Sequence, residues 1–365
     1  MSKARELAEL GAVYDSGALS NRNLIINGAM QVAQRGTSVS NATGGYTTVD
    51  RFFQTGTLGG TFSWAQSSTA PDGFSSSFKV SVPTGFSSLT SSASARIGYA
   101  FEGQDLQQLK KGTSNAEKVT LSFYVRAKVT GTYVVELYDT DNTRHICTTY
   151  TINTADTWEK KTITFDGDTS GSLDNDNASS LVVHWWLAAG SNFTSGTLPT
   201  TWSSVTTANR AVGQVNSMAS NNDEWYLTGV QLELGTEATP FEHRSFADEL
   251  LKCKRYYESS NRDITGNANT DRIAYLNYTC YTTSSAYCTY FFEVEKRAIP
   301  TITHGSSNWR IYQNNALIST GGAGGTDGIG HRNFSLTISG PTFDVSEGGM
   351  CDYRQFDGIK IDAEL

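Results

Sequence analysis

Four aromatic residues of this chain are the best candidates for contact with a ligand. An aromatic ring can stack on the C–H face of a sugar ring while polar neighbours read its hydroxyl groups. The aromatic residues that have polar or aromatic neighbours suited to such a site are Trp64, Tyr99, Trp185 and Trp186. For any single aromatic residue, however, packing in the core is the more common role.

The tryptophan pair gives one independent reason to expect a surface aromatic. Adjacent residues of a strand point to opposite faces of a sheet, so only one of Trp185 and Trp186 is expected in the core. The other is expected on an outer face or under a loop.

Catalysis has much weaker support. The five histidines lie in unrelated segments, and HExxH, GxSxG and P-loop patterns are missing from the sequence. A polysaccharide hydrolase needs two carboxylates about 5–10 Å apart over a sugar. The paired acids Asp139 with Asp141 and Asp174 with Asp176 instead lie in turn sequences, where aspartate is favoured by its backbone hydrogen bonds. We therefore expect a protein that is not an enzyme and needs no cofactor.

The cysteines favour neither a disulfide framework nor a zinc site. They are odd in number and lack CxxC spacing, so buried free thiols are the simplest interpretation. The five are Cys147, Cys253, Cys280, Cys288 and Cys351.

Size and charge exclude several classes of protein. A chain of 365 residues exceeds the usual size of one domain, so two domains are expected. The formal net charge of −8 opposes a phosphate backbone, which argues against nucleic-acid binding. No apolar run approaches the roughly 20 residues that span a bilayer, so membrane insertion is not expected. The N-terminus lacks the apolar centre of a signal peptide, which indicates synthesis in a cytoplasm.

Short alternating segments separated by turns predict an all-β protein. Their spacing before Phe241 is typical of a jelly-roll β-sandwich, two packed antiparallel sheets. The expected strands of this first domain are Leu24–Val32, Tyr46–Gln54, Thr61–Ser67, Phe78–Val82, Arg96–Glu102, Val119–Lys128, Gly131–Tyr138, Ile146–Ile152, Trp158–Phe165, Leu181–Ala188 and Glu224–Leu234. We also expect a single helical turn over Gln104–Lys111.

A short helix is expected after the sandwich, over Ser245–Glu258. Ser245 and Asp248 have the spacing of a capping box. An apolar seam runs along this helix through Phe246, Leu250, Cys253 and Tyr257. That seam fits a connector packed between two domains, and it also fits a three-fold contact along an axis.

A smaller β-domain is expected after the helix. Its predicted strands lie near Arg272–Cys280, Ala286–Val294, Thr301–Thr303, Trp309–Gln313, Phe334–Ser339 and Phe356–Leu365. The run Ser319–His331 has no apolar periodicity, which predicts a mobile or exposed loop. The expected organisation is therefore an N-terminal segment with a short amphipathic helix and a linker (1–22), a jelly roll (23–242), a helical neck (243–260) and a C-terminal β-domain (261–365).

Several segments together resemble one family of proteins. They are NRNLIINGAMQVAQRGTS (Asn21–Ser38), GYTTVDRFF (Gly45–Phe53), LTGVQLELGTEATPFEHRSFADELLKCKRYY (Leu227–Tyr257) and the C-terminal DAEL. The pattern looks like the tail-fibre and tail-spike proteins of marine and other tailed bacteriophages, which carry a jelly-roll domain similar to carbohydrate-binding modules.

The resemblance implies a virion fibre protein, a homotrimer joined along the helical seam. Its N-terminal segment would attach to other tail or capsid proteins, and it would adsorb to a host-surface glycan or protein through exposed loops, chiefly Ser319–His331. The expectation of a sugar site rests mainly on this resemblance. A structural or decorating protein without a ligand and, less favoured, a polysaccharide depolymerase are the alternatives.

The resemblance also bears on two pairs of polar residues. Asp50 and Arg51, in VDRFF, are expected to form a buried pair that holds a loop, because a bidentate fork fixes geometry. Related jelly rolls often hold a structural calcium near the first and last strands, which makes Asn27 and Glu233 candidate oxygen ligands. The metal content stays open, since the sequence does not show that these oxygens converge.

Overall fold

The structure is a computed structural model that describes residue 3 and residues 21–42, 44–58, 62–260, 274–304, 309–314, 316–320, 323–339, 342–353 and 359–365. The chain divides into two compact units, residues 1–249 with Leu365, and residues 250–364. The expected N-terminal amphipathic helix lies outside the described residues except for Lys3.

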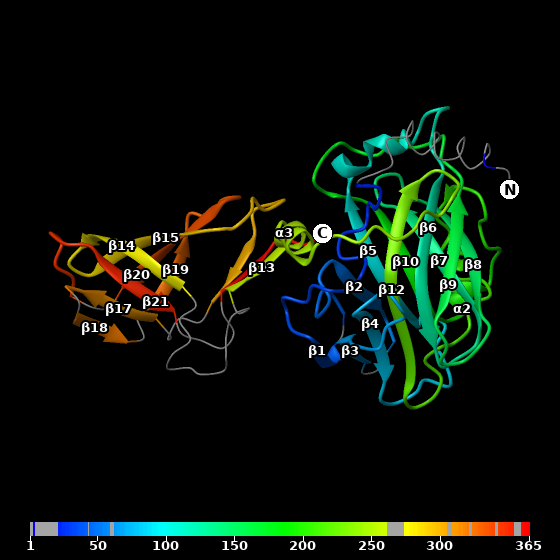
Figure 1. Ribbon diagram of the computed structural model, residues 1–365, viewed down its shortest axis with the longest axis horizontal. Coiled ribbons are helices and arrows are strands. Elements are labelled where there is room, and N and C mark those ends of the chain that lie inside the picture. The colour runs from blue at the N-terminus through cyan, green and yellow to red at the C-terminus, as the bar shows by residue number, and fades with distance from the viewer. Residues whose placement is uncertain are drawn as a thin grey trace. The chain divides into compact units, whose positions relative to one another are not determined.

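The first unit is a β-sandwich of two six-stranded antiparallel sheets (Figure 1). The first sheet has the order β1-β3-β4-β12-β6-β9 and the second the order β11-β8-β7-β10-β5-β2. The strands are β1 (Ser38–Ala42), β2 (Phe52–Gly56), β3 (Phe62–Ser67), β4 (Ser77–Val82), β5 (Ser94–Glu102), β6 (Val119–Ala127), β7 (Gly131–Asp139), β8 (Arg144–Ile152), β9 (Glu159–Phe165), β10 (Ser179–Ala189), β11 (Ser203–Ser204) and β12 (Asp223–Leu234). The expected jelly-roll-like sandwich is confirmed.

One apolar core fills the space between the two sheets. In β6, Leu121, Phe123 and Val125 point inward and are fully buried, as the alternation of the sequence predicts. They pack with inward residues of β10 and β12, such as Trp185 and Trp225. The expected helical turn is also present as the 3₁₀ helix η1 (Gly103–Leu109), which buries Leu106 and Leu109.

The prediction of a first strand over Leu24–Val32 is wrong. This segment is irregular, because Asn27 and Met30 have φ angles of 61° and 58°, which a strand does not contain. The side chain of Asn27 takes over backbone hydrogen bonds: its Oδ1 accepts from the N–H of Val32 at 2.9 Å, and its Nδ2 donates to the carbonyls of Val32 and Asp50. The segment still lies beside β12, because Leu24 donates its N–H to the carbonyl of Leu232 and Val230 donates its N–H to the carbonyl of Gly28, both at 2.9 Å.

The second unit contains a three-stranded sheet of order β13-β22-β16 and a seven-stranded sheet of order β18-β17-β21-β14-β15-β20-β19. The strands are β13 (Tyr257–Ser259), β14 (Ala274–Thr282), β15 (Ser285–Phe291), β16 (Thr301–Thr303), β17 (Trp309–Gln313), β18 (Ala316–Thr320), β19 (Ala323–Asp327), β20 (Asn333–Ser339), β21 (Gly349–Tyr353) and β22 (Lys360–Asp362). Its core gathers inward residues such as Trp309, Ile311, Phe334, Leu336 and Cys351.

The run Ser319–His331 is not simply a loop, contrary to expectation. Part of it forms β19, which pairs with β20 through Gly325 opposite Thr337 and Asp327 opposite Ser335. Because β19 lies at the edge of the sheet and its described side chains are exposed, it needs no apolar alternation. The prediction of a loop relied on the lack of apolar periodicity, and an edge strand can lack it too.

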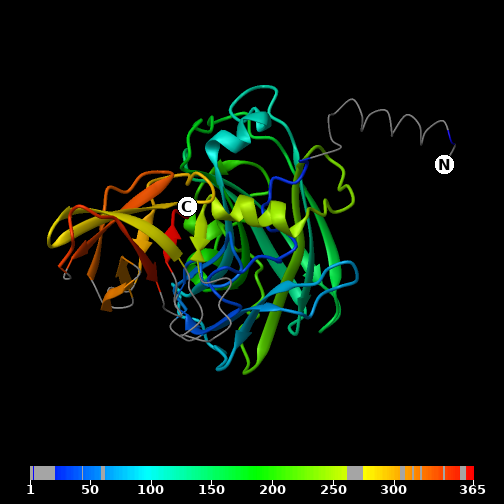
Figure 2. The ribbon, with the colours of Figure 1, turned by 60° about the vertical axis from the view of Figure 1, so that its left-hand side comes forward.

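The helix that follows the sandwich is shorter than expected. The helix α3 (Phe246–Lys254), yellow-green in Figure 2, ends four residues before Glu258, and Tyr257 begins strand β13 instead. No helix among the described residues is long and apolar enough to cross a membrane.

Candidate functional site

The structure buries all four aromatic residues that were expected to contact a ligand. Trp64, Tyr99 and Trp185 belong to the core between the two sheets. Tyr99 also accepts a hydrogen bond from the N–H of Ile26 at its phenol oxygen, at 2.8 Å. Since these rings already pack inside the protein, none of them offers a face to a sugar in this conformation.

Trp186 lies on the opposite face of β10, as the alternation predicts, but it is fully buried. It packs with Cys147, Phe193 and Ala211, so the segment that follows β10 covers the outer face of the second sheet at this point. This segment contains α2 (Ser191–Thr194) and η2 (Thr207–Asn209). The second tryptophan is therefore under a loop and not on an open surface.

Under the same cover lies a buried ion cluster centred on Glu136. Arg210 Nε and Nη2 each lie 2.8 Å from a carboxylate oxygen of Glu136, in a bidentate pair. His145 Nδ1 lies 3.0 Å from the same carboxylate, and Trp186 Nε1 donates to it at 3.3 Å. His184 Nδ1 lies 3.3 Å from Glu136 Oε2. We call these five residues the Glu136 cluster.

Burial and ion pairing shift the pKa values inside the Glu136 cluster. Burial alone would raise the pKa of Glu136, but hydrogen bonds from His145, His184 and Arg210 hold it well below its usual value. Burial lowers the pKa of His184 to about 4, and its contact with Glu136 opposes this shift only in part. At neutral pH the cluster therefore holds an ionised carboxylate against a guanidinium and a neutral His184.

Two members of the Glu136 cluster, together with the neighbouring Cys147, have the composition of a metal site. The ligand atoms of Glu136, His145 and Cys147 all lie within 4.8 Å of one another. Arg210, however, already neutralises both carboxylate oxygens, and a metal ion would have to approach this cation closely. Burial also raises the pKa of the Cys147 thiol, which opposes the thiolate that a metal needs. These contacts favour a structural ion network over a metal centre.

The candidate calcium ligands are engaged with protein donors. Glu233 accepts hydrogen bonds from the N–H and the hydroxyl of Thr239 and from Gln231 Nε2. The side-chain oxygen of Asn27 accepts from the N–H of Val32. Each side chain therefore holds nearby backbone: Glu233 binds the N–H of Thr239, and Asn27 binds the N–H of Val32.

Asp50 and Arg51 are both buried, as expected of residues that hold a loop. Asp50 accepts from the backbone N–H and the side-chain amide of Gln34, at 2.9 and 2.6 Å. Arg51 donates to the carbonyl of Ala100 at 2.7 Å, and its guanidinium lies 5.1 Å from the ring centre of Tyr99. These contacts tie the residues before β2 to the second sheet.

The paired acids hold turns. Asp139 forms a buried ion pair with Lys111, and it accepts from the N–H of Asn142. Asp141 accepts from the N–H of Asp174, and Asp176 accepts from the N–H of Ala178. Backbone hydrogen bonds of this kind are the reason for which aspartate is favoured in turns.

A cavity of about 460 Å³ lies beside η1. Its lining combines leucine side chains with uncharged polar groups and two lysines: Leu106, Gln107, Lys110, Lys111, Thr113, Asn115, Ser172 and Leu173. Lys111 pairs with Asp139 and Asp168, and Lys110 pairs with Glu117 at 2.6 Å. Since each lysine already has a carboxylate partner, the cavity does not present an uncompensated positive charge.

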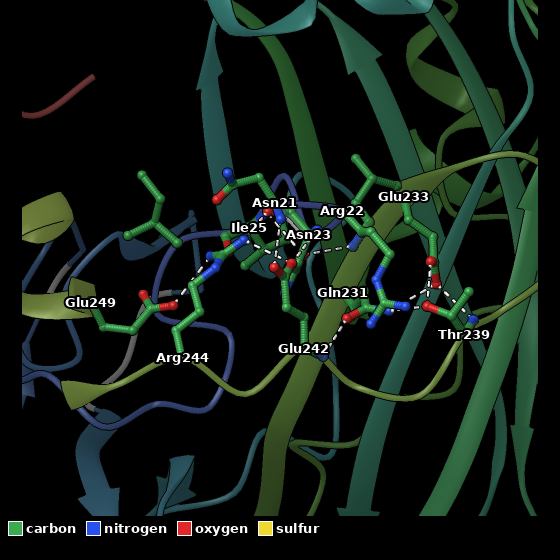
Figure 3. A network of polar contacts seen from close by, with 12 residues as sticks. Asn21, Arg22, Asn23, Ile25, Gln231, Glu233, Thr239, Glu242, Arg244 and Glu249 are labelled. Atoms are coloured by element: carbon green, nitrogen blue, oxygen red, sulfur yellow. Dashed lines mark hydrogen bonds and ion pairs between the residues drawn. The ribbon is translucent and has the colours of Figure 1, made fainter. Parts of the chain in front are cut away.

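A network of polar contacts joins the two ends of the sandwich chain (Figure 3). Arg244 donates to the carbonyls of Asn23 and Ile25 at 2.5 and 3.1 Å. Glu242 accepts from the backbone N–H groups of Asn21 and Asn23 at 2.7 and 2.8 Å. Arg244 also pairs with both Glu242 and Glu249. We call the leading residues Asn21–Ile25 and the trailing residues Glu242, Arg244 and Glu249 the clasp.

The residues of the predicted trimer seam do not line up along one helix. Leu250 and Cys253 lie in α3, whereas Tyr257 lies in β13, and all three are buried in this single chain. Phe246 is the exposed member, and Leu251 beside the seam is exposed as well. The predicted seam therefore does not continue along one helix.

Three exposed aromatic residues were missed by the sequence analysis. Tyr281 is 73% exposed, Phe291 is 70% exposed and Tyr287 is 38% exposed. They lie in β14 and β15 of the second unit, and we call them the aromatic face. The signal in the sequence was a pair of strands that are rich in aromatic and hydroxyl residues and contain no charged residue.

No family model and no curated protein matches this chain. Solved structures that resemble it include the enzymatically active domain of tailspike protein 4 of bacteriophage CBA120, at 16% identity, with 59% of this chain and 22% of that chain covered and a TM-score of 0.30. A family 11 carbohydrate-binding module of Clostridium thermocellum matches at 12% identity, with coverages of 59% and 97% and a TM-score of 0.28. The module TmCBM61, solved with β-1,4-galactotriose, matches at 7% identity, with coverages of 60% and 100% and a TM-score of 0.30.

These similarities are low in identity and in TM-score. The match spans about a fifth of the tailspike chain. They do not assign an activity or a ligand to this chain.

Proposed function

We propose that this chain is a phage virion fibre protein that helps the particle adsorb to the host surface, by binding and without catalysis. The observation that carries this proposal is the clasp. The segment that leads into the sandwich and the segment that leaves it lie side by side and are joined by Arg244 and Glu242. A domain whose entering and leaving segments are held together can be inserted between other parts of an elongated assembly without a change in its two sheets.

The motifs that resemble tail-fibre proteins support the same role. They include both halves of the clasp, Asn21–Ser38 and Leu227–Tyr257. In this proposal the residues before Asn21 attach to other tail proteins, and three copies assemble on the particle. Several weak sites on one particle raise the strength of attachment without a tight single site.

A structural component of the tail or capsid without a ligand is the second candidate. The burial of Trp64, Tyr99, Trp185 and Trp186 favours it, because the sandwich then presents none of its expected sugar-stacking rings. The two candidates differ in where the protein lies on the particle and in whether it contacts host cells.

Electron microscopy of the intact particle, combined with competition by the purified chain, tests the proposal. We expect copies at the tail, and we expect the added chain to reduce adsorption of particles to host cells. Copies bound only to the capsid, together with no competition, would leave the structural component as the better account.

A further inference from the structure

We propose that the outer face of β14, β15 and β20 in the second unit binds a neutral glycan chain. This inference names a ligand class and a site for the adsorption that is proposed above, and its biological meaning rests on that role. The site is carried by the aromatic face and by the uncharged polar residues around it.

The aromatic residues point away from the core of their own unit. In β15, Ala286 and Cys288 are buried, whereas the alternate residues Tyr287, Thr289 and Phe291 are exposed. Inward residues of β20, such as Leu336, are buried in the same way. The period of two places the exposed set on one face of the sheet.

The aromatic rings and the polar residues are neighbours across strands. Tyr287 is paired with Thr279 of β14 and with Thr337 of β20. The rings of Tyr281 and Tyr287 lie 5.6 Å apart at an angle of 77°. Tyr281 lies within an irregularity in the pairing of β14 with β15, between Cys280 and Thr282.

A second polar row lies between the two ends of the aromatic face. Thr289 of β15 is paired with Ser335, and Phe291 is paired with Asn333. The hydroxyl groups of Thr289 and Ser335 therefore lie between the tyrosine pair and Phe291, and the amide of Asn333 lies beside Phe291. Tyr287 and Phe291 are four positions apart along one strand, a distance of roughly 13 Å, so the face suits an elongated ligand.

The chemistry of the face selects a class of ligand. The strands β14, β15 and β20 contain no Asp, Glu, Lys or Arg, although 18% of the chain is charged. These three strands therefore offer no charged group to pair with a phosphate, sulfate, carboxylate or amine, and Asp327 of the edge strand β19, paired with Ser335, places one carboxylate at the margin of the face. A sugar chain offers C–H faces for the rings and hydroxyl groups for Thr, Ser and Asn, which this pattern matches. An apolar protein partner would leave many of these polar groups without hydrogen bonds.

Affinity electrophoresis of the full chain tests this site. Gels would contain one polysaccharide each: dextran, galactan, mannan or xylan as neutral probes, and alginate as an anionic probe. We expect at least one neutral probe to slow the wild-type chain. The triple variant Tyr281→Ala, Tyr287→Ala, Phe291→Ala should bind that probe at least about tenfold more weakly, since exposed rings can be removed without opening the core.

A matched control removes exposed apolar side chains elsewhere in the same unit. Ile299 and Val345 are 63% and 54% exposed, and the double variant Ile299→Ala, Val345→Ala should migrate as the wild type does. Retardation by alginate alone, by no neutral probe, or to the same extent in the triple variant would overturn the glycan site.

Competition for host cells separates this inference from the proposed function. If the wild-type chain and the triple variant compete equally well with particles for host cells, the result supports the adsorption role and contradicts the glycan site. If the aromatic face binds neutral polysaccharide but the wild-type chain does not compete for host cells, the result supports the glycan site and contradicts the adsorption role.

Discussion

Arg244, in the segment that follows the last strand of the sandwich, donates a hydrogen bond to the backbone carbonyl of Asn23, which lies 221 positions earlier in the chain. The distance between Nη2 and the carbonyl oxygen is 2.5 Å, and the side chain of Arg244 is only 9% exposed. One guanidinium therefore links the two ends of the first unit.

Replacing Arg244 by alanine should destabilise the first unit by about 2–4 kcal/mol, because Glu242 and Glu249 would lose a buried cationic partner. Urea unfolding followed by tryptophan fluorescence measures this change. The control is Lys118→Ala, which removes a surface ion pair with Asp166 and should change stability by no more than about 0.5 kcal/mol. Equal effects of the two substitutions would contradict a structural role of the clasp.

His184 should make stability depend on pH between about 6.5 and 4. The folded-state pKa of about 4 lies below the unfolded value, so the unfolded chain binds a proton first on acidification. Stability should therefore fall as the pH falls through this window, by at most about 3 kcal/mol from this residue. Urea unfolding at pH 7 and pH 5 measures the fall. It should shrink in His184→Gln and persist in His243→Gln, a histidine outside the Glu136 cluster.

Trp186 should matter for stability and not for ligand contact. Its ring lies 4.6 Å from the guanidinium of Arg96, and its N–H donates to Glu136. Trp186→Ala should cost about 3–5 kcal/mol, as for other fully buried large side chains. Trp186→Phe keeps most of the packing and should cost less. Retardation in polysaccharide gels should stay unchanged in any variant that remains folded, and a selective loss of binding would refute this assignment.

Ser245 should stabilise the first turn of α3. Its Oγ accepts from the N–H of Asp248 at 3.1 Å and donates to the carboxylate of Asp248 at 2.6 Å. Ser245→Ala should cost about 1 kcal/mol and speed hydrogen exchange at the Asp248 amide, whereas Ser245→Asp should preserve the cap. If the alanine variant exchanges no faster than the aspartate variant, the cap contributes nothing to this turn.

Period-two alternation made most of the sandwich predictable. It identified β6 through Leu121 and Phe123, and the capping spacing identified the start of α3 at Ser245. These signals are local, because each is contained in a few neighbouring residues. The predicted end of the helix was wrong, since the pairing of Tyr257 with Asp362 of β22 is a contact over a long sequence distance.

The candidate site was much less predictable than the fold. Sequence alternation placed one of Trp185 and Trp186 on the outer face of their sheet, but the segment that covers Trp186 comes from residues that show no apolar period. Likewise, Gly325 and its neighbours form an edge strand only because β20 supplies the partner. Whether a ring is covered depends on such distant segments, and a local pattern does not contain that information.

The clasp also determines how the first unit would respond to a mechanical pull. Tension applied between the residues before Asn21 and those after Glu249 meets the hydrogen bonds of Arg244 and Glu242 first. While these bonds hold, the pull passes across the clasp, and the strands between Ser38 and Leu234 are not stretched. In the proposed adsorption role, a pull on the particle would then strain one small ion-paired junction and leave the two sheets unstretched.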